Sequence, residues 1–120
     1  MNELSERLLD FGARVVKPVT ALPPTAVARR IGDQLLRSGT AVGANYEEAQ
    51  GAESKLDFLH KMQIALKEVR ESHYWLRLLA KAEVVAEERL APLIDESLQL
   101  RAILSKAVAT AKGKQKIAAP

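Results

Sequence analysis

The residues best suited to acid–base or metal chemistry are two histidines, His60 and His73, and the carboxylates near them. Both fall in one helical pattern, where their spacing places them on different sides of the helix. Asp57 and His60 have an i,i+3 ligand spacing, but a di-iron bundle needs two Glu-x-x-His motifs and two further glutamates. No second motif exists, and no Gly-rich phosphate loop follows a strand. We therefore predict no catalytic residues, no metal and no cofactor.

A second group of chemistry-bearing residues is a basic arc around an aromatic ring. Within roughly 80° of one helical segment the sequence gathers cations and a tyrosine, namely Lys67, Arg70, Tyr74, Arg77 and Lys81. Cations follow phosphates, and an exposed ring offers a base a stacking platform. The arc predicts a nucleic-acid-binding face. The alternative is a solvated face, because basic residues at i,i+4 also keep helices soluble.

The opposite outer face of the same segment combines carboxylates with large apolar side chains. Its members are Ile64, Glu68, Glu71, Trp75 and Leu78. Large apolar side chains are unusual on a solvated face, and tryptophan is enriched at protein interfaces. The pattern predicts a subunit contact. The alternative is a loop or tail of the same chain that folds over this face.

The segment before it carries three glycines and one asparagine inside a helical pattern. Gly32, Gly39 and Gly43 each cost about 1 kcal/mol relative to alanine, and they share one narrow edge. We predict that another helix packs closely there; the alternative is a mobile helix that tolerates glycine. Asn45 lies on the apolar stripe, where a buried amide needs a partner. We predict a partner within the bundle that fixes its register, with a ligand contact as the alternative.

Four amphipathic helices would position these residues. The 3.6-residue apolar period recurs four times and no period of two persists, which predicts helices over about 3–17, 26–50, 55–81 and 88–111. Pro18 should end or kink the first helix; Thr25 and Ser54 are suitable N-caps. Short connections make sequential helices antiparallel neighbours. The predicted fold class is all-α, an antiparallel up-down-up-down four-helix bundle over residues 1–111, followed by a disordered basic tail, 112–120.

Composition agrees with one domain that lies in the cytoplasm. The 120 residues are 48% hydrophobic but only 4% aromatic, so the core must rest on aliphatic side chains. The absence of cysteine excludes disulfides and thiolate sites. No apolar run approaches the ~20 residues that span a bilayer, and the first residues do not resemble a secretory signal. The net charge of +3 lies partly in the tail, so charge alone is weak support for a nucleic-acid partner.

Two stretches of the sequence resemble a known family. Residues 36–49 contain Arg37-Ser38-Gly39-Thr40 and Gly43-Ala44-Asn45, and residues 57–76 contain Asp57-Phe58-Leu59-His60-Lys61 and Glu71-Ser72-His73-Tyr74-Trp75-Leu76. They resemble the signature of the four-helix-bundle proteins encoded in 23S rRNA intervening sequences. The resemblance implies rings of five subunits, a largely unassigned biochemical role and no catalytic residues. It also implies a relationship to the accessory variability protein of diversity-generating retroelements, a basic pentamer that works with a reverse transcriptase and RNA.

Together these observations predict a non-enzymatic bundle that homo-oligomerises, as a pentamer, and binds structured RNA or a nucleoprotein, with no membrane partner. Arg37, Ser38, Gly39, Thr40, Gly43 and Asn45 would form its structural motif. A protein-interaction adaptor without a nucleic-acid role is the second hypothesis. A metal or small-ligand bundle is the third.

Overall fold

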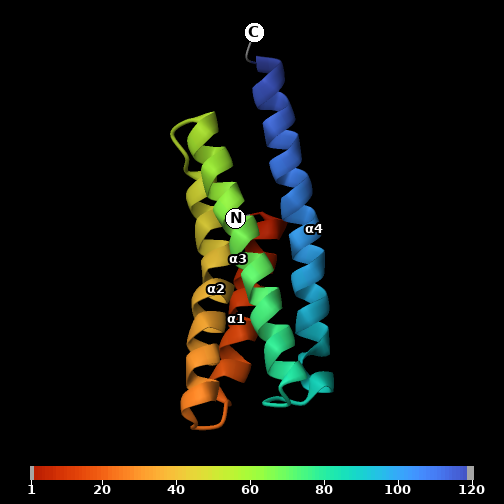
Figure 1. The fold of residues 1–120 in the computed structure, drawn as a ribbon. Coiled ribbons are helices and arrows are strands. Elements are labelled where there is room, and N and C mark those ends of the chain that lie inside the picture. The colour runs from red at the N-terminus through yellow and green to blue at the C-terminus, as the bar shows by residue number, and fades with distance from the viewer. Residues whose placement is uncertain (1, 119–120) are drawn as a thin grey trace.

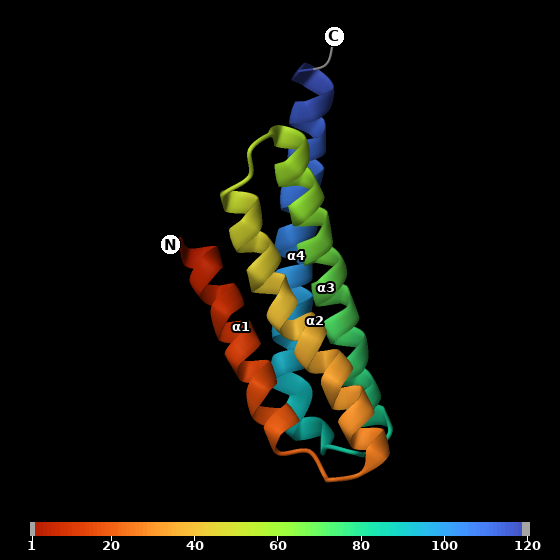
Figure 2. The same ribbon diagram turned by 90° about the vertical axis from the view of Figure 1, so that its left-hand side faces the viewer.

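The structure, a computed structural model, describes residues 2–118, and the side chains of residues 2–113. Four helices follow one another: α1 (Glu3–Thr20), α2 (Ala26–Gln50), α3 (Lys55–Lys81) and α4 (Glu87–Ala118). The described part of the chain holds no strand. Consecutive helices run in opposite directions (Figures 1 and 2). Helices that follow one another in sequence pack side by side, and α4 also packs against α1. The contact between α1 and α4 involves fewer residues than the other three. The predicted four-helix bundle is confirmed.

Side-chain caps determine where three helices begin. Asn2 Oδ1 accepts a hydrogen bond from the Ser5 amide at 2.7 Å. Thr25 Oγ1 accepts from the Ala28 amide at 3.1 Å, and Ser54 Oγ accepts from the Asp57 amide at 3.0 Å. Each cap satisfies an amide that has no partner within its helix. The predicted bounds of α2 and α3 are therefore confirmed.

The first and last helices, α1 and α4, are longer than predicted. Helix α1 continues past Pro18 to Thr20, because a proline in the last turn removes few of the helix's hydrogen bonds, and Thr20 Oγ1 donates to the Val16 carbonyl at 2.8 Å. Helix α4 continues past residue 111 to Ala118, where the sequence predicted a disordered tail. Alanine and lysine favour helix enough to offset Gly113. Residues 119–120 of that predicted tail lie outside the described residues.

The core is aliphatic, as the composition predicts. Its largest fully buried side chains are Phe11, Leu8, Leu35, Met62, Leu76, Leu79, Leu90, Leu100, Leu104, Val15, Val42 and Val69. Burying such a side chain stabilises the fold by roughly 1.5–3 kcal/mol. Buried serines join the helices: the hydroxyls of Ser38 on α2 and Ser72 on α3 lie 3.0 Å apart.

Helices α1 and α2 approach closely through glycine, as predicted. A Cβ on Gly39 would lie 2.8 Å from both methyls of Val15, and one on Gly32 would lie 2.6 Å from Leu22 Cδ1. A Cβ on Gly43 would meet Leu8 at 3.4 Å. Three glycines on one edge of α2 thus let α1 and the connection after it pack against the helix backbone. The alternative, a mobile helix, is not needed to explain them.

Candidate nucleic-acid interface

The predicted basic arc lies on one exposed side of α3, beside α4. Lys67, Tyr74 and Lys81 follow one another at i, i+7 and i+14, and Arg70 and Arg77 flank the ring. All five are exposed. Helix α4 adds Arg101, which sequence reasoning missed because it lies on another helix. These residues, apart from Lys67, line an open hollow of about 750 Å³ together with Glu71, His73 and Leu78.

We call Lys67, Arg70, Arg77, Lys81 and Arg101, grouped around Tyr74, the basic face. Among the described residues, the cations that form ion pairs are Arg7, Arg37 and Lys61. No cation of the basic face has a carboxylate partner in that part of the chain. The five charges are therefore available to an anionic ligand that lies along α3 and α4.

His73 lies half-buried on the floor of the hollow. Burial lowers the pKa of this imidazole below its ordinary value, and the positive charges of Arg77 and Arg101 lower it further. Each effect disfavours the protonated form. His73 is therefore neutral at neutral pH in the free protein. A negatively charged ligand in the hollow would oppose the two arginines and favour its protonation.

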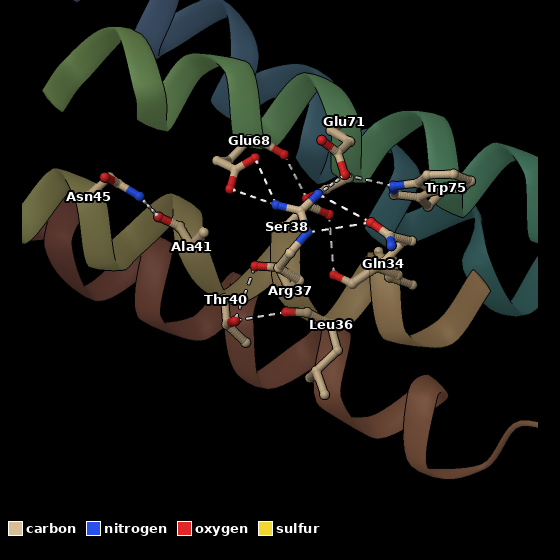
Figure 3. A network of polar contacts seen from close by, with 12 residues as sticks. Gln34, Leu36, Arg37, Ser38, Thr40, Ala41, Asn45, Glu68, Glu71 and Trp75 are labelled. Atoms are coloured by element: carbon tan, nitrogen blue, oxygen red, sulfur yellow. Dashed lines mark hydrogen bonds and ion pairs between the residues drawn. The ribbon is translucent and has the colours of Figure 1, made fainter. Parts of the chain in front are cut away.

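Trp75, the neighbour of Tyr74 on α3, belongs to a polar network that crosses to α2 (Figure 3). The rings of Tyr74 and Trp75 meet in a T-shaped contact, with centroids 5.0 Å apart. Trp75 Nε1 donates to Glu71 Oε2 at 3.0 Å. Arg37 also donates to Glu71, and its Nη1 donates to Glu68 Oε2 at 3.1 Å. One arginine of α2 thus holds two carboxylates of α3 and, through one of them, the indole.

The predicted subunit-contact face is not an open surface. Glu68 is buried, with 8% of its surface exposed; Ile64, Glu71, Trp75 and Leu78 are half-buried. Trp75 packs against the core, and Arg37 of α2 reaches across Glu68 and Glu71. The expectation of an outward-pointing face is thus wrong for Glu68, which is buried beside Arg37 of α2, and for Trp75, which packs against the core. Whether this face touches another subunit stays a prediction.

The predicted structural motif contributes to two different seams of the bundle. Arg37 and Ser38 contact α3, whereas Gly39 and Gly43 contact α1. Thr40 is exposed and its Oγ1 donates to the Leu36 carbonyl at 2.7 Å. Asn45 differs from expectation: its Nδ2 donates to the Ala41 carbonyl of its own helix at 2.9 Å. The half-buried amide thus has its predicted partner within the bundle, but that partner lies on its own helix, so the predicted role in fixing the register between helices is wrong.

An apolar groove between α1 and α2 is a feature that sequence reasoning missed. It measures about 430 Å³ and is lined by Ser5, Leu8, Leu9, Gly12, Ala13, Val16, Thr40, Gly43, Ala44 and Glu47. Leu9 and Val16 are exposed on one side of it. Leu36, also exposed, lies one turn from Thr40 on the other side. The signal was the excess of small residues in both helices, which leaves the valley between them unfilled.

Metal and membrane chemistry find no support in the described residues. His60 is exposed, and no three histidine or acidic side chains of that part of the chain converge as a metal site would require. None of its helices has the length and apolarity needed to cross a bilayer.

Known proteins place the chain in a family. A sequence model of the 23S rRNA-intervening sequence proteins matches residues 2–106. The chain belongs to this family. A crystal structure of a protein of unknown function from the S23 ribosomal protein family of Bacteroides thetaiotaomicron is similar, at 34% identity and a TM-score of 0.82. The match covers 88% of this chain and 97% of that one. No curated protein matches the chain.

Proposed function

We propose that this protein is a non-enzymatic, cytoplasmic helical bundle that homo-oligomerises and binds structured RNA through its basic face. The observation that carries the RNA half is a set of five cations without carboxylate partners around an exposed tyrosine. Such a surface follows a phosphate backbone. Membership of the 23S rRNA-intervening sequence family is compatible with this role, and the family description assigns no reaction.

A charge-matched pair of variants tests RNA binding. Lys67, Arg70 and Arg77 are changed to alanine in one protein. In the other the same substitution is made at Lys17, Arg29 and Arg30, which are exposed and have no ion pair in the described structure. Both lose three positive charges. Filter binding to a structured RNA should weaken at least tenfold in the first variant and far less in the control.

The salt dependence provides a second readout. Each phosphate contact contributes about 0.7 to 0.9 to the slope of log affinity against log salt. The slope of the first variant should therefore fall by roughly 2 to 3 relative to wild type. Equal losses in both variants would indicate non-specific attraction by net charge. Absent or salt-insensitive binding by wild type would overturn the RNA role.

Self-association is supported by two complementary surfaces on different sides of the bundle. The groove between α1 and α2 is concave and apolar. The outer side of α4 carries an uncharged stripe of about 80°, formed by Ala91, Ile94, Leu98, Ala102, Ser105 and Ala109, of which all but Ile94 are exposed. A ring of identical subunits needs two different surfaces that fit each other. The occupant of the groove is accordingly the α4 stripe of a second copy, with Leu98 entering beside Gly12 and Ala13.

Charge at one end of this contact is complementary. Glu47 lies at one end of the groove, and Lys106 lies about 12 Å beyond Leu98 along α4. In a ring whose axis parallels the bundle, α4 of one copy runs in the direction of α2 of the next. Lys106 then approaches Glu47. The ring of five subunits that the family resemblance implies is the assembly we expect.

Light scattering tests this assembly. Wild type should have a mass five times that of the 13.2 kDa chain. Leu9→Glu and Leu98→Glu should each be monomeric, whereas a mixture of the two should form a dimer, because one intact groove and one intact stripe remain. Leu56→Glu is the control, since Leu56 is as exposed (66%) as Leu9 (57%) but lies outside both surfaces. A monomeric wild type, or a mixture that stays monomeric, would contradict the contact.

The second candidate function is a protein-interaction adaptor without a nucleic-acid role. The apolar groove favours it, because a groove between two helices also accepts an amphipathic helix of another protein. An affinity purification from cells distinguishes the two functions. An adaptor keeps its protein partners after nuclease treatment and yields no enriched RNA after crosslinking.

A further inference from the structure

We propose that Tyr74 is the stacking platform for one unpaired base, and that the RNA this protein prefers contains an unpaired nucleotide within a helical stem. The inference rests on the proposed RNA binding by the basic face and specifies its ligand class. Arg37, on the neighbouring helix, acts as a positioning residue for this platform.

Tyr74 is more exposed than the apolar side chains beside it on α3. It has 58% of its surface accessible, although it lies mid-helix beside two half-buried apolar side chains of the outer α3 surface, Trp75 and Leu78. An exposed ring that serves no core packing is free to contact a ligand. Stacking on an aromatic face contributes about 1–3 kcal/mol per base and tolerates any base.

Contacts with neighbouring side chains hold the exposed ring of Tyr74 in place. Its T-shaped contact with Trp75 (centroids 5.0 Å apart) restricts its movement, and Trp75 itself packs against the core. The indole N–H is held by Glu71 at 3.0 Å, and Arg37 holds Glu71 (Figure 3). The position of the platform is thus determined by contacts that reach helix α2. A preorganised ring loses less conformational freedom when a base stacks on it.

Arg37 also reduces a charge conflict. Glu71 lines the hollow beside the basic face and Glu68 lies one turn before it on α3, so their negative charges would repel a phosphate. Arg37 Nη1 contacts both Glu68 carboxylate oxygens, at 3.1 and 3.4 Å, and its Nη2 pairs with Glu71. The single positive charge of its guanidinium therefore offsets one of these two negative charges from the α2 side. The cations of α3 and α4 are left as the dominant charges around the ring.

The cations are distributed on both sides of Tyr74 along the helix. Arg70 and Arg77 lie about 6 Å and 4.5 Å from it along the axis, at the 1.5 Å rise per residue. Arg101 closes the side toward α4. A backbone that follows these cations passes the ring with phosphates on either side. Only a base outside a duplex stack can turn onto the ring, because paired bases are enclosed by their neighbours.

Two hairpins with the same stem test the inference, one fully paired and one with a single bulged adenosine. Wild type should prefer the bulged hairpin by roughly 5- to 150-fold, the range that one stacked base provides. Tyr74→Leu should lose that preference while keeping its affinity for the paired hairpin and its salt slope. Tyr74→Phe should retain the preference, because the ring remains. Replacement of the bulged base by 2-aminopurine should show fluorescence quenching with wild type and not with Tyr74→Leu.

The positioning role of Arg37 has its own readout. Trp75→Phe keeps a ring but removes the N–H that Glu71 accepts, and Arg37→Met removes the charge that holds Glu71. Both should reduce the quenching and the preference for the bulge by more than they reduce binding to the paired hairpin. Circular dichroism checks that each variant is folded. If Arg37→Met does not fold, Trp75→Phe alone still tests the positioning role.

Failure of the inference and failure of the proposed function give different results. Equal binding of both hairpins by wild type, or an unchanged preference in Tyr74→Leu, would overturn stacking while RNA binding stands. A Tyr74→Phe variant that behaves like Tyr74→Leu would also overturn it, since the hydroxyl would then be the contact. Quenching that persists in Trp75→Phe and Arg37→Met would overturn the positioning role. No binding of either hairpin by wild type would overturn the proposed function itself.

Discussion

Arg7 and Glu96 join the first helix to the last through a bidentate ion pair. Arg7 Nε and Nη2 each donate to one oxygen of the Glu96 carboxylate at 2.8 Å, and Nη2 also reaches Gln99 Oε1 at 2.8 Å. The pair spans the seam at which the bundle closes, where α1 and α4 adjoin over the fewest residues. Two parallel hydrogen bonds fix geometry as well as charge. The ion pair therefore fixes α1 against α4 at this seam, whereas the buried side chains of α1, such as Leu8 and Phe11, hold it in the core.

Removing this carboxylate should destabilise the bundle in a pH-dependent way. The hydrogen bonds from Arg7 lower the pKa of Glu96, against the opposing effect of burial. A lowered folded-state pKa gives stability that is present above the ordinary glutamate value of 4.5 and is lost as the pH falls through the folded-state pKa. In urea unfolding at pH 7, the free energy of unfolding of Glu96→Gln should be lower than that of wild type by about 0.5–1 kcal/mol, the range for a partly exposed pair.

The difference in the free energy of unfolding between wild type and Glu96→Gln should become smaller as the pH is lowered from 7 to 3, because the Glu96 carboxylate of wild type then loses its charge as well. Gln99→Ala is a suitable control, since it removes one contact of Arg7 without a charge change. A Glu96→Gln variant as stable as wild type at pH 7, or a loss that does not depend on pH, would show that the pair does not hold α1.

Two glycine substitutions should change stability in opposite directions. Gly39→Ala places a Cβ 2.8 Å from both methyls of Val15, so overpacking should destabilise the fold by about 1–3 kcal/mol, offset in part by helix propensity. In Gly12→Ala the nearest heavy atoms lie at 3.9 Å, which is ordinary contact. This change should stabilise by up to about 1 kcal/mol. Thermal unfolding compares them directly, and equal effects would contradict the close approach at Gly39.

How far the sequence predicts this structure depends on how many helices determine a feature. The bounds of α2 and α3 follow from local chemistry, because Thr25 and Ser54 cap their own helices. The cations along α3 share one face by helical periodicity alone, and that prediction is confirmed. Periodicity gives the direction of Glu68 and Glu71 around α3 but not the side chain of α2 that pairs with them. That side chain is Arg37, and its role requires knowledge of how α2 and α3 pack.

The parts of the candidate site that were missed all come from a second helix. Arg101 completes the hollow from α4, and nothing in its own spacing relates it to Tyr74. The α1–α2 groove exists because glycines on two helices face each other, so neither helix alone indicates it. The register-fixing role predicted for Asn45 fails for a different reason: its partner within the bundle is the carbonyl of Ala41, a local alternative available to any helical asparagine.

RNA binding should strengthen as the pH is lowered from 7.5 to 5.5. Burial, Arg77 and Arg101 lower the pKa of His73 in the free protein, so the imidazole is neutral at pH 7.5, with Arg70 and Tyr74 also lining its hollow. A bound phosphate opposes these arginines and raises the pKa. Binding then takes up a proton, and linkage requires affinity to rise as pH falls between the two pKa values.

Fluorescence titrations at constant salt should show the rise in wild type but not in His73→Gln. His60→Gln, at an exposed histidine outside the hollow, should behave as wild type. An equal pH dependence in all three proteins would assign the effect to other groups.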